Sequence, residues 1–314
     1  MNVRSKYVLI ALLCALIVAF EAVAIEGALN IENLNVLLVS AMPSLMGGII
    51  LMSIYPRGTA GFTRSLSRRG WISMVTMCAF VAAGVILWFD AVSRIGAGKE
   101  AILGGGSSEV LFVVVLSAIF LSERLDKLEA IGSALVVLGV FIVLMNMNEF
   151  RLSFGFGEAE AILSSLCLGI SVVMTTALLR DHDLTPLSGL ELFLSGSIVM
   201  LFGMSTGLIS FPGVRGWVIL VLLGLFPAMG LLTYNAGLPK IGASLVSVLF
   251  ALNGIMTVCV QMAILLIFPD ADIKLPQSVL LAMLGGAVAF VGVYLLNKKE
   301  LPAVMGRSQD GSST

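Results

Sequence analysis

The chain has 314 residues, of which 59% are hydrophobic and only 12% charged, and its formal net charge is -1. A water-soluble domain of this size cannot bury so much apolar sequence, so the ordinary soluble classes are excluded. The net charge near zero also removes the general attraction to phosphates on which nucleic-acid-binding proteins rely. The composition therefore predicts a protein embedded in a lipid bilayer.

Ten apolar runs follow one another along the chain, each close to the roughly 20 residues that cross a bilayer as a helix. Continuous runs of this length exclude the alternating pattern of a membrane β-barrel. The fold expected is therefore all-α and integral to the membrane, with ten transmembrane helices. The predicted spans are residues 7–28, 36–54, 71–89, 98–121, 130–147, 158–180, 187–209, 216–235, 241–268 and 277–296.

Lys and Arg residues are unevenly divided between the two sides of this topology. Loop 55–70 carries most of the bias, because it holds Arg57, Arg64, Arg68 and Arg69 and no acidic residue. Positively charged loops stay on the cytoplasmic side. We therefore expect a multi-pass protein of the plasma (cell inner) membrane with both termini in the cytoplasm.

Two segments of the first half are echoed in the second half. Ile-Gly-Ala at 95–97 recurs at 241–243, and each copy is followed by an apolar helix with an internal polar residue, Glu109 or Asn253. The glycine spacing at 132–139 recurs at 285–292. Five spans per copy is an odd number, so the second copy must be inverted relative to the first.

This organisation predicts three segments. They are a first five-helix repeat at 1–148, a second five-helix repeat at 149–297, and a disordered cytoplasmic tail at 298–314. Inverted repeats suit alternating access, because the two halves can exchange inward-open and outward-open shapes.

Several of these segments resemble a known family. Ile95-Gly-Ala-Gly-Lys-Glu-Ala-Ile-Leu, Glu109-Val-Leu-Phe, Leu121-Ser-Glu-Arg-Leu125 and the Gly132–Gly139 helix are similar to the EamA family of the drug/metabolite transporter superfamily. The resemblance implies ten helices around a central cavity, and a cargo of amino acids, metabolites, sugars or drugs. The chain departs from the family pattern at Val110, where relatives often have proline, and in lacking a Glu-Arg helix end in its second half.

Glu21 lies near the middle of the first span, where an ionised carboxylate costs roughly 2.5–3.5 kcal/mol. It therefore either faces a wet cavity or is protonated. Its position resembles the membrane glutamate of the small multidrug resistance family, which implies a site for protons or substrate ammonium groups. A neutral Glu21 bonded to a neighbouring helix is the structural alternative.

Glu109 lies halfway down the fourth span, directly after the residues Gly104-Gly-Gly-Ser-Ser. Three glycines weaken a helix, but small residues also permit close helix packing, which is the interpretation we favour for them. We place Glu109 in a cavity, where it and Asn253 would bracket a zwitterion or polyol. Trp88 is either an interfacial belt residue or a cavity residue, and Tyr234, which begins the second echo, completes the candidate site.

No pattern in the sequence predicts catalysis, a cofactor or a metal. The four cysteines lie in apolar runs, and the single histidine, His182, lies in a loop. We therefore expect a permease rather than an enzyme, most simply an exporter of small metabolites, amino acids or drugs, with proton coupling through Glu21 or Glu109 as a further hypothesis. The partners expected are a small-molecule substrate and the bilayer, with the chain as a monomer or homodimer. The alternatives are a lipid-carrier flippase and a membrane-embedded enzyme acting on lipids.

Overall fold

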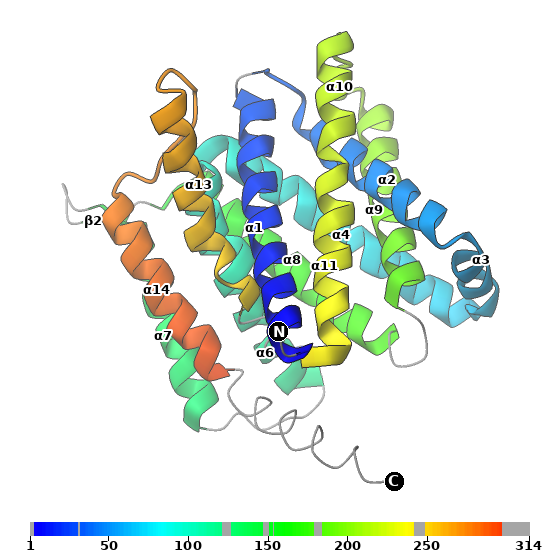
Figure 1. Ribbon diagram of the computed structural model, residues 1–314, viewed down its shortest axis with the longest axis horizontal. Coiled ribbons are helices and arrows are strands. Elements are labelled where there is room, and N and C mark those ends of the chain that lie inside the picture. Colours follow the sequence, from blue (N-terminus) through cyan, green and yellow to red (C-terminus); the bar gives the residue numbers. More distant parts are fainter. Residues whose placement is uncertain are drawn as a thin grey trace.

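The computed structural model describes residues 3–30, 32–120, 127–146, 151–152, 154–178, 184–241 and 249–296. Within these ranges the architecture is helical (Figure 1). The first half contains α1 (Val3–Asn30), α2 (Val36–Ile54), α3 (Pro56–Ser65), α4 (Arg68–Ile95), α5 (Ala97–Leu103), the π-helical segment η1 (Gly104–Ser108), α6 (Glu109–Phe120) and α7 (Lys127–Leu144). The second half contains α8 (Phe156–Leu178), α9 (Leu184–Thr206), α10 (Val214–Leu223), α11 (Leu225–Ile241), α13 (Asn253–Ile267) and α14 (Val279–Leu296).

A short antiparallel ladder links the two halves. It joins β1 (Met145–Asn146) to β2 (Arg151–Leu152).

The described helices confirm the predicted helical membrane architecture. Six of them are long and apolar enough to cross a bilayer, at residues 6–30, 36–54, 68–95, 156–175, 185–206 and 214–234. Shorter apolar helices lie at 130–144, 253–267 and 279–295. Large apolar side chains such as Leu266, Leu280 and Leu201 are well exposed, as expected for a surface that faces lipid rather than water.

Helices of the two halves pair in a two-fold pattern. The first helix of each half packs against the third span of the other, so α1 lies on α11 and α8 lies on α4. The second helices pair with each other, as α2 with α9, and the last helices pair as α7 with α14. This exchange of partners is what a two-fold relation between equivalent units requires.

The α7–α14 contact shows that the two halves are inverted. A Cβ atom placed on Gly139 would lie 2.5 Å from the carbonyl oxygen of Gly285, and one placed on Gly292 would lie 2.6 Å from that of Gly132. The C-terminal half of α7 therefore faces the N-terminal half of α14, and the C-terminal half of α14 faces the N-terminal half of α7. The two helices are antiparallel. Because these are the glycines of the sequence echo, equivalent helices run in opposite directions.

Two predicted spans are interrupted. The fourth span, expected at 98–121, divides into α5, η1 and α6. The eighth span, expected at 216–235, has a turn residue at Gly224, between α10 and α11. Pro227 lies in the first turn of α11, where its missing N–H leaves no helical bond unmade.

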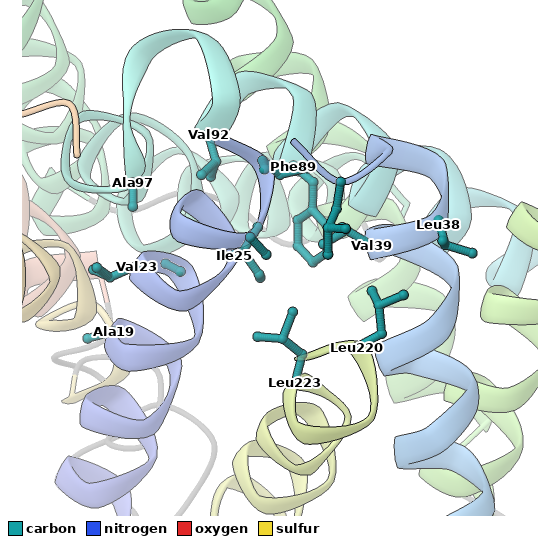
Figure 2. Packing of buried hydrophobic residues seen from close by; sticks show 14 of the residues in the cluster. Ala19, Val23, Ile25, Leu38, Val39, Phe89, Val92, Ala97, Leu220 and Leu223 are labelled. Atoms are coloured by element: carbon teal, nitrogen blue, oxygen red, sulfur yellow. The ribbon is translucent and has the colours of Figure 1, made fainter. Parts of the chain in front are cut away.

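An apolar cluster joins α1, α2, α4 and α10 near the C-terminal end of α1. Figure 2 shows Ile25, Val39, Phe89, Leu220 and Leu223 converging from these four helices. Phe89 and Ile25 are almost wholly buried. This cluster fixes the end of α1 against the first residues of α2 and the last turns of α4.

Candidate functional site

Glu21 is buried in the middle of α1, with 6% of its surface exposed. Neither a hydrogen bond nor an ion pair joins its carboxylate to another described residue. The bond to a neighbouring helix that the structural alternative requires is therefore not formed within the described part of the chain. A carboxylate placed this way at membrane depth is a functional-site candidate.

Glu109 is the first residue of α6 and follows the π-helical segment η1 directly. It is partly buried, and like Glu21 it has no bonded partner among the described residues. Within η1, the hydroxyls of Ser107 and Ser108 donate to the carbonyls of Ile102 and Leu103, five residues earlier. Such π-helical turns are frequently found at functional sites. The glycines were expected mainly to serve packing, and the loosened helix is what the structure adds.

Asn253 lies opposite η1. It is the first residue of α13 and is 2% exposed, and its Nδ2 lies 3.7 Å from a Cβ placed on Gly105. Thr257 donates its hydroxyl hydrogen to Asn253 Oδ1 at 3.0 Å or to its carbonyl at 2.8 Å. Glu109 and Asn253 thus occupy matching positions, each opening a helix after an irregular turn.

A small pocket lies between α5, η1, α13 and α14. Ala101, Ser107, Gly254 and Gly286 are among its lining residues, and its volume is about 10 Å³. That is room for about one water molecule. This pocket is too small for a metabolite in the conformation described.

Trp88 has a specific partner that the sequence did not predict. Its indole Nε1 donates to Glu100 Oε2 at 2.6 Å, and Glu100 is 1% exposed. Glu100 in turn lies against η1, because a Cβ placed on Gly104 would collide with its Oε1. Trp88 therefore reaches, through Glu100, the region that contains the predicted site. A Lys-Glu pair at 99–100 in an otherwise apolar span was the available signal.

Tyr234 lies away from these residues. Its ring packs edge-on against Phe250, with ring centroids 5.9 Å apart, and it belongs to an apolar cluster around Ala11. Ala11 precedes Glu21 by ten residues on α1, which is about 15 Å along a helix. The structure therefore does not bring Tyr234 together with Glu21.

Glu26 accepts hydrogen bonds from three residues far apart in the sequence, and it was not predicted as a site residue. It is fully buried. Its Oε2 accepts from the backbone N–H of Ala97 at 3.1 Å and from Gln261 Nε2 at 2.7 Å, while Oε1 accepts from the backbone N–H of Lys274 at 2.6 Å. One side chain on α1 thus holds the start of α5, the middle of α13 and the segment before α14.

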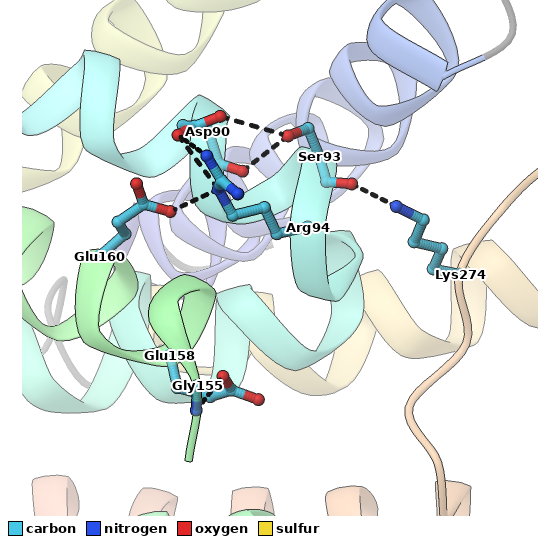
Figure 3. Close-up of polar contacts among 7 residues, drawn as sticks. All are labelled: Asp90, Ser93, Arg94, Gly155, Glu158, Glu160 and Lys274. Atoms are coloured by element: carbon cyan, nitrogen blue, oxygen red, sulfur yellow. Dashed lines mark hydrogen bonds and ion pairs between the residues drawn. The ribbon is translucent and has the colours of Figure 1, made fainter. Parts of the chain in front are cut away.

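Ion pairs also lie at the end of the molecule that contains Glu26 and the start of α5. Lys99 Nζ lies 2.5 Å from Glu158 Oε1, with both side chains nearly buried. Arg94 bridges Asp90 at 2.9 Å and Glu160 at 3.0 Å, and so joins α4 to α8 (Figure 3). The ammonium group of Lys274 donates to the carbonyl of Ser93, also visible in Figure 3. Glu158 and Glu160, the acids in the first turns of α8, thus pair with basic residues of α5 and α4.

Metal binding has no candidate site within the described ranges. No group of three or more His, Cys, Asp or Glu side chains is placed there to hold an ion.

Comparison with known proteins identifies the family. The model of the EamA-like transporter family matches the chain twice, over residues 5–145 and 155–298. A solved structure described only as a crystal structure of a protein shares 17% identity, with a TM-score of 0.62 over 96% of this chain and 99% of that chain. At this identity it shows a shared fold alone. No curated protein sequence matches the chain. The chain therefore belongs to the EamA-like transporter family.

Proposed function

We propose that this EamA-like transporter carries a small molecule across the plasma membrane by alternating access, through ten spans in two inverted five-helix repeats. In this proposal α5, η1 and α6 form one span, and α10 and α11 form another. The two-fold exchange of helix partners and the antiparallel α7–α14 contact support it. The start of α1 and the end of α14 lie at the same end of the molecule (Figure 1), as an even number of spans requires. By the charge rule this end is cytoplasmic.

The observation that carries the proposal is a set of buried or half-buried carboxylates inside apolar helices. Glu21 and Glu109 have no bonded partner among the described residues, and Glu100 has only the indole of Trp88. Carboxylates at membrane depth are costly and occur mainly where they bind cargo or protons. Asn253 adds a donor and an acceptor from the other repeat.

This chemistry favours a cargo that carries an amino group, such as an amino acid or a cationic drug. Glu109 and Asn253 would bind it from the two repeats, and Glu21 or Glu109 would exchange protons. An imposed proton gradient would then drive export of the cargo.

The test is transport by purified protein in liposomes, with pooled amino acids, sugars and cationic drugs. Each pool is measured with and without an imposed pH gradient. We expect gradient-dependent transport of an amine-containing pool, and its loss in Glu21→Gln or Glu109→Gln. Glu32→Gln is the matched control, because the ion pair of Glu32 is with Arg215, whose side chain is 82% exposed. Transport of no pool would contradict the proposal and favour a lipid-linked cargo.

A further inference from the structure

The buried cluster around Glu26 has a role that the cargo site does not explain. We propose that Glu26, Ala97, Gln261 and Lys274, here called the Glu26 latch, hold one end of the transport pathway closed. Breaking the latch would open the pathway from that side. The inference rests on the proposed alternating-access function. Under the charge rule, the end that contains the latch is the outer end.

The latch joins the two repeats. Glu26 and Ala97 belong to the first half of the chain, whereas Gln261 and Lys274 belong to the second. Gln261 Nε2 also donates to the carbonyl of Lys274 at 3.3 Å, which fastens the segment before α14 to α13. Alternating access moves one repeat against the other, so these bonds must break when this end opens.

The backbone is fitted closely at the same place. Gly96, between α4 and α5, has a φ of 82°, and a Cβ placed on it would collide with the carbonyl oxygen of Lys274. Lys99 pairs with Glu158 and Arg94 with Glu160, so α4 and α5 are also tied to α8 in the other repeat. Two sets of contacts between the repeats thus close this end: Glu26 joins α1 to α13, and the two ion pairs join α4 and α5 to α8.

The latch requires a carboxylate at position 26. Three N–H groups converge on Glu26, and a carboxylate can accept all of them. Glutamine has nearly the same shape but offers an NH2 group in place of one acceptor oxygen. Glu26→Gln therefore sets donor against donor without changing the packing volume. Turning over the amide of Gln261 cannot compensate. Its oxygen would then face the carbonyl oxygen of Lys274, and a backbone N–H, that of Ala97 or of Lys274, would still face the new NH2 group.

The test measures how easily this end opens. A cysteine at Ala101, which is 2% exposed and lines the small pocket one turn below the latch, serves as the reporter. It is placed in a background without the four native cysteines and treated with a membrane-impermeant thiol reagent in sealed vesicles. A second reporter at Asp272, exposed on the segment before α14, identifies the vesicles whose latch end faces the reagent.

Reporter labelling should be slow with the latch intact and at least about tenfold faster with Glu26→Gln, because one hydrogen bond to a charged group already changes an equilibrium by about that factor. Gln261→Ala, which removes one of the three donors, should accelerate labelling less. Glu32→Gln removes a carboxylate at the same end of α1 but outside the latch, and should leave the rate unchanged.

Wild-type labelling rates in both Glu26→Gln and Gln261→Ala would overturn the proposal. If Glu26→Gln does not fold, as judged by size-exclusion chromatography, Gln261→Ala decides the question alone. The result is separate from that of the transport assay. Faster labelling without transport would support the latch and contradict the transport function. Transport with unchanged labelling would support the transport function and contradict the latch.

Discussion

The glycine contact between α7 and α14 gives a quantitative test of the inverted arrangement. In Gly139→Ala the new methyl group would lie 2.5 Å from the carbonyl oxygen of Gly285 and 2.7 Å from the Cβ of Ala289. Ordinary contact begins near 3.4 Å, so the helices must separate locally by about 0.7–0.9 Å. Overpacking of this kind costs about 1–3 kcal/mol. Alanine regains roughly 0.5–1 kcal/mol of helix propensity, which leaves a net loss of stability.

Symmetry extends this prediction to the other repeat. Gly292→Ala should lose a similar free energy of unfolding. Its methyl group would lie 2.6 Å from the carbonyl oxygen of Gly132 and 2.7 Å from the backbone nitrogen of Val136, as that of Gly139→Ala would lie 2.5 Å from the carbonyl oxygen of Gly285 and 2.7 Å from the backbone nitrogen of Ala289. Gly61→Ala is the control, since nothing lies within 4 Å of a Cβ there and helix propensity alone should raise stability. Unfolding by SDS titration in mixed micelles measures all three. The reasoning is refuted if Gly139→Ala behaves like the control, or if the two equivalent variants differ by more than about 2 kcal/mol.

Two further comparisons use the same unfolding assay. Gly96→Ala should lower the free energy of unfolding by at least about 1 kcal/mol more than Gly207→Ala does. Both glycines have positive φ, but of the two only Gly96 would place its new Cβ against a neighbouring carbonyl. Equal losses would show that this close backbone contact does not affect stability. Lys99→Met should lower the free energy of unfolding by about 3–5 kcal/mol, because it leaves the buried Glu158 without its ammonium partner. Arg94→Gln should lower it by less than about 1 kcal/mol, because the Arg94 side chain is 47% exposed. The opposite order would contradict the burial argument.

The repeat organisation was predictable because it depends on local spacing. Glycines seven residues apart at 132–139 and at 285–292 mark one helix face, and that face is where α7 and α14 meet. The polar residues Glu109 and Asn253 could be paired by the same echo. Helical spans follow from apolar length alone, whereas the interruption at Gly224 between α10 and α11 was not predicted.

The latch and the Trp88–Glu100 bond could not be predicted in this way. The donors to Glu26 come from three elements that are distant in the sequence, and two of them are backbone N–H groups that any residue supplies. Only the fold shows that they converge. The signal that was present is compositional: Glu26 lies five residues after Glu21 in an apolar helix, and Gln261 is a second amide in the helix of Asn253.

Counterflow in proteoliposomes tests the central claim most directly. Vesicles are loaded with an excess of the unlabelled cargo found in the pooled screen, and a trace of labelled cargo is added outside. An alternating-access carrier returns with the labelled molecule after releasing an unlabelled one, so the account predicts a transient accumulation above equilibrium that Glu109→Gln abolishes. A steady approach to equilibrium without any overshoot, equal in wild type and Glu109→Gln, would contradict it.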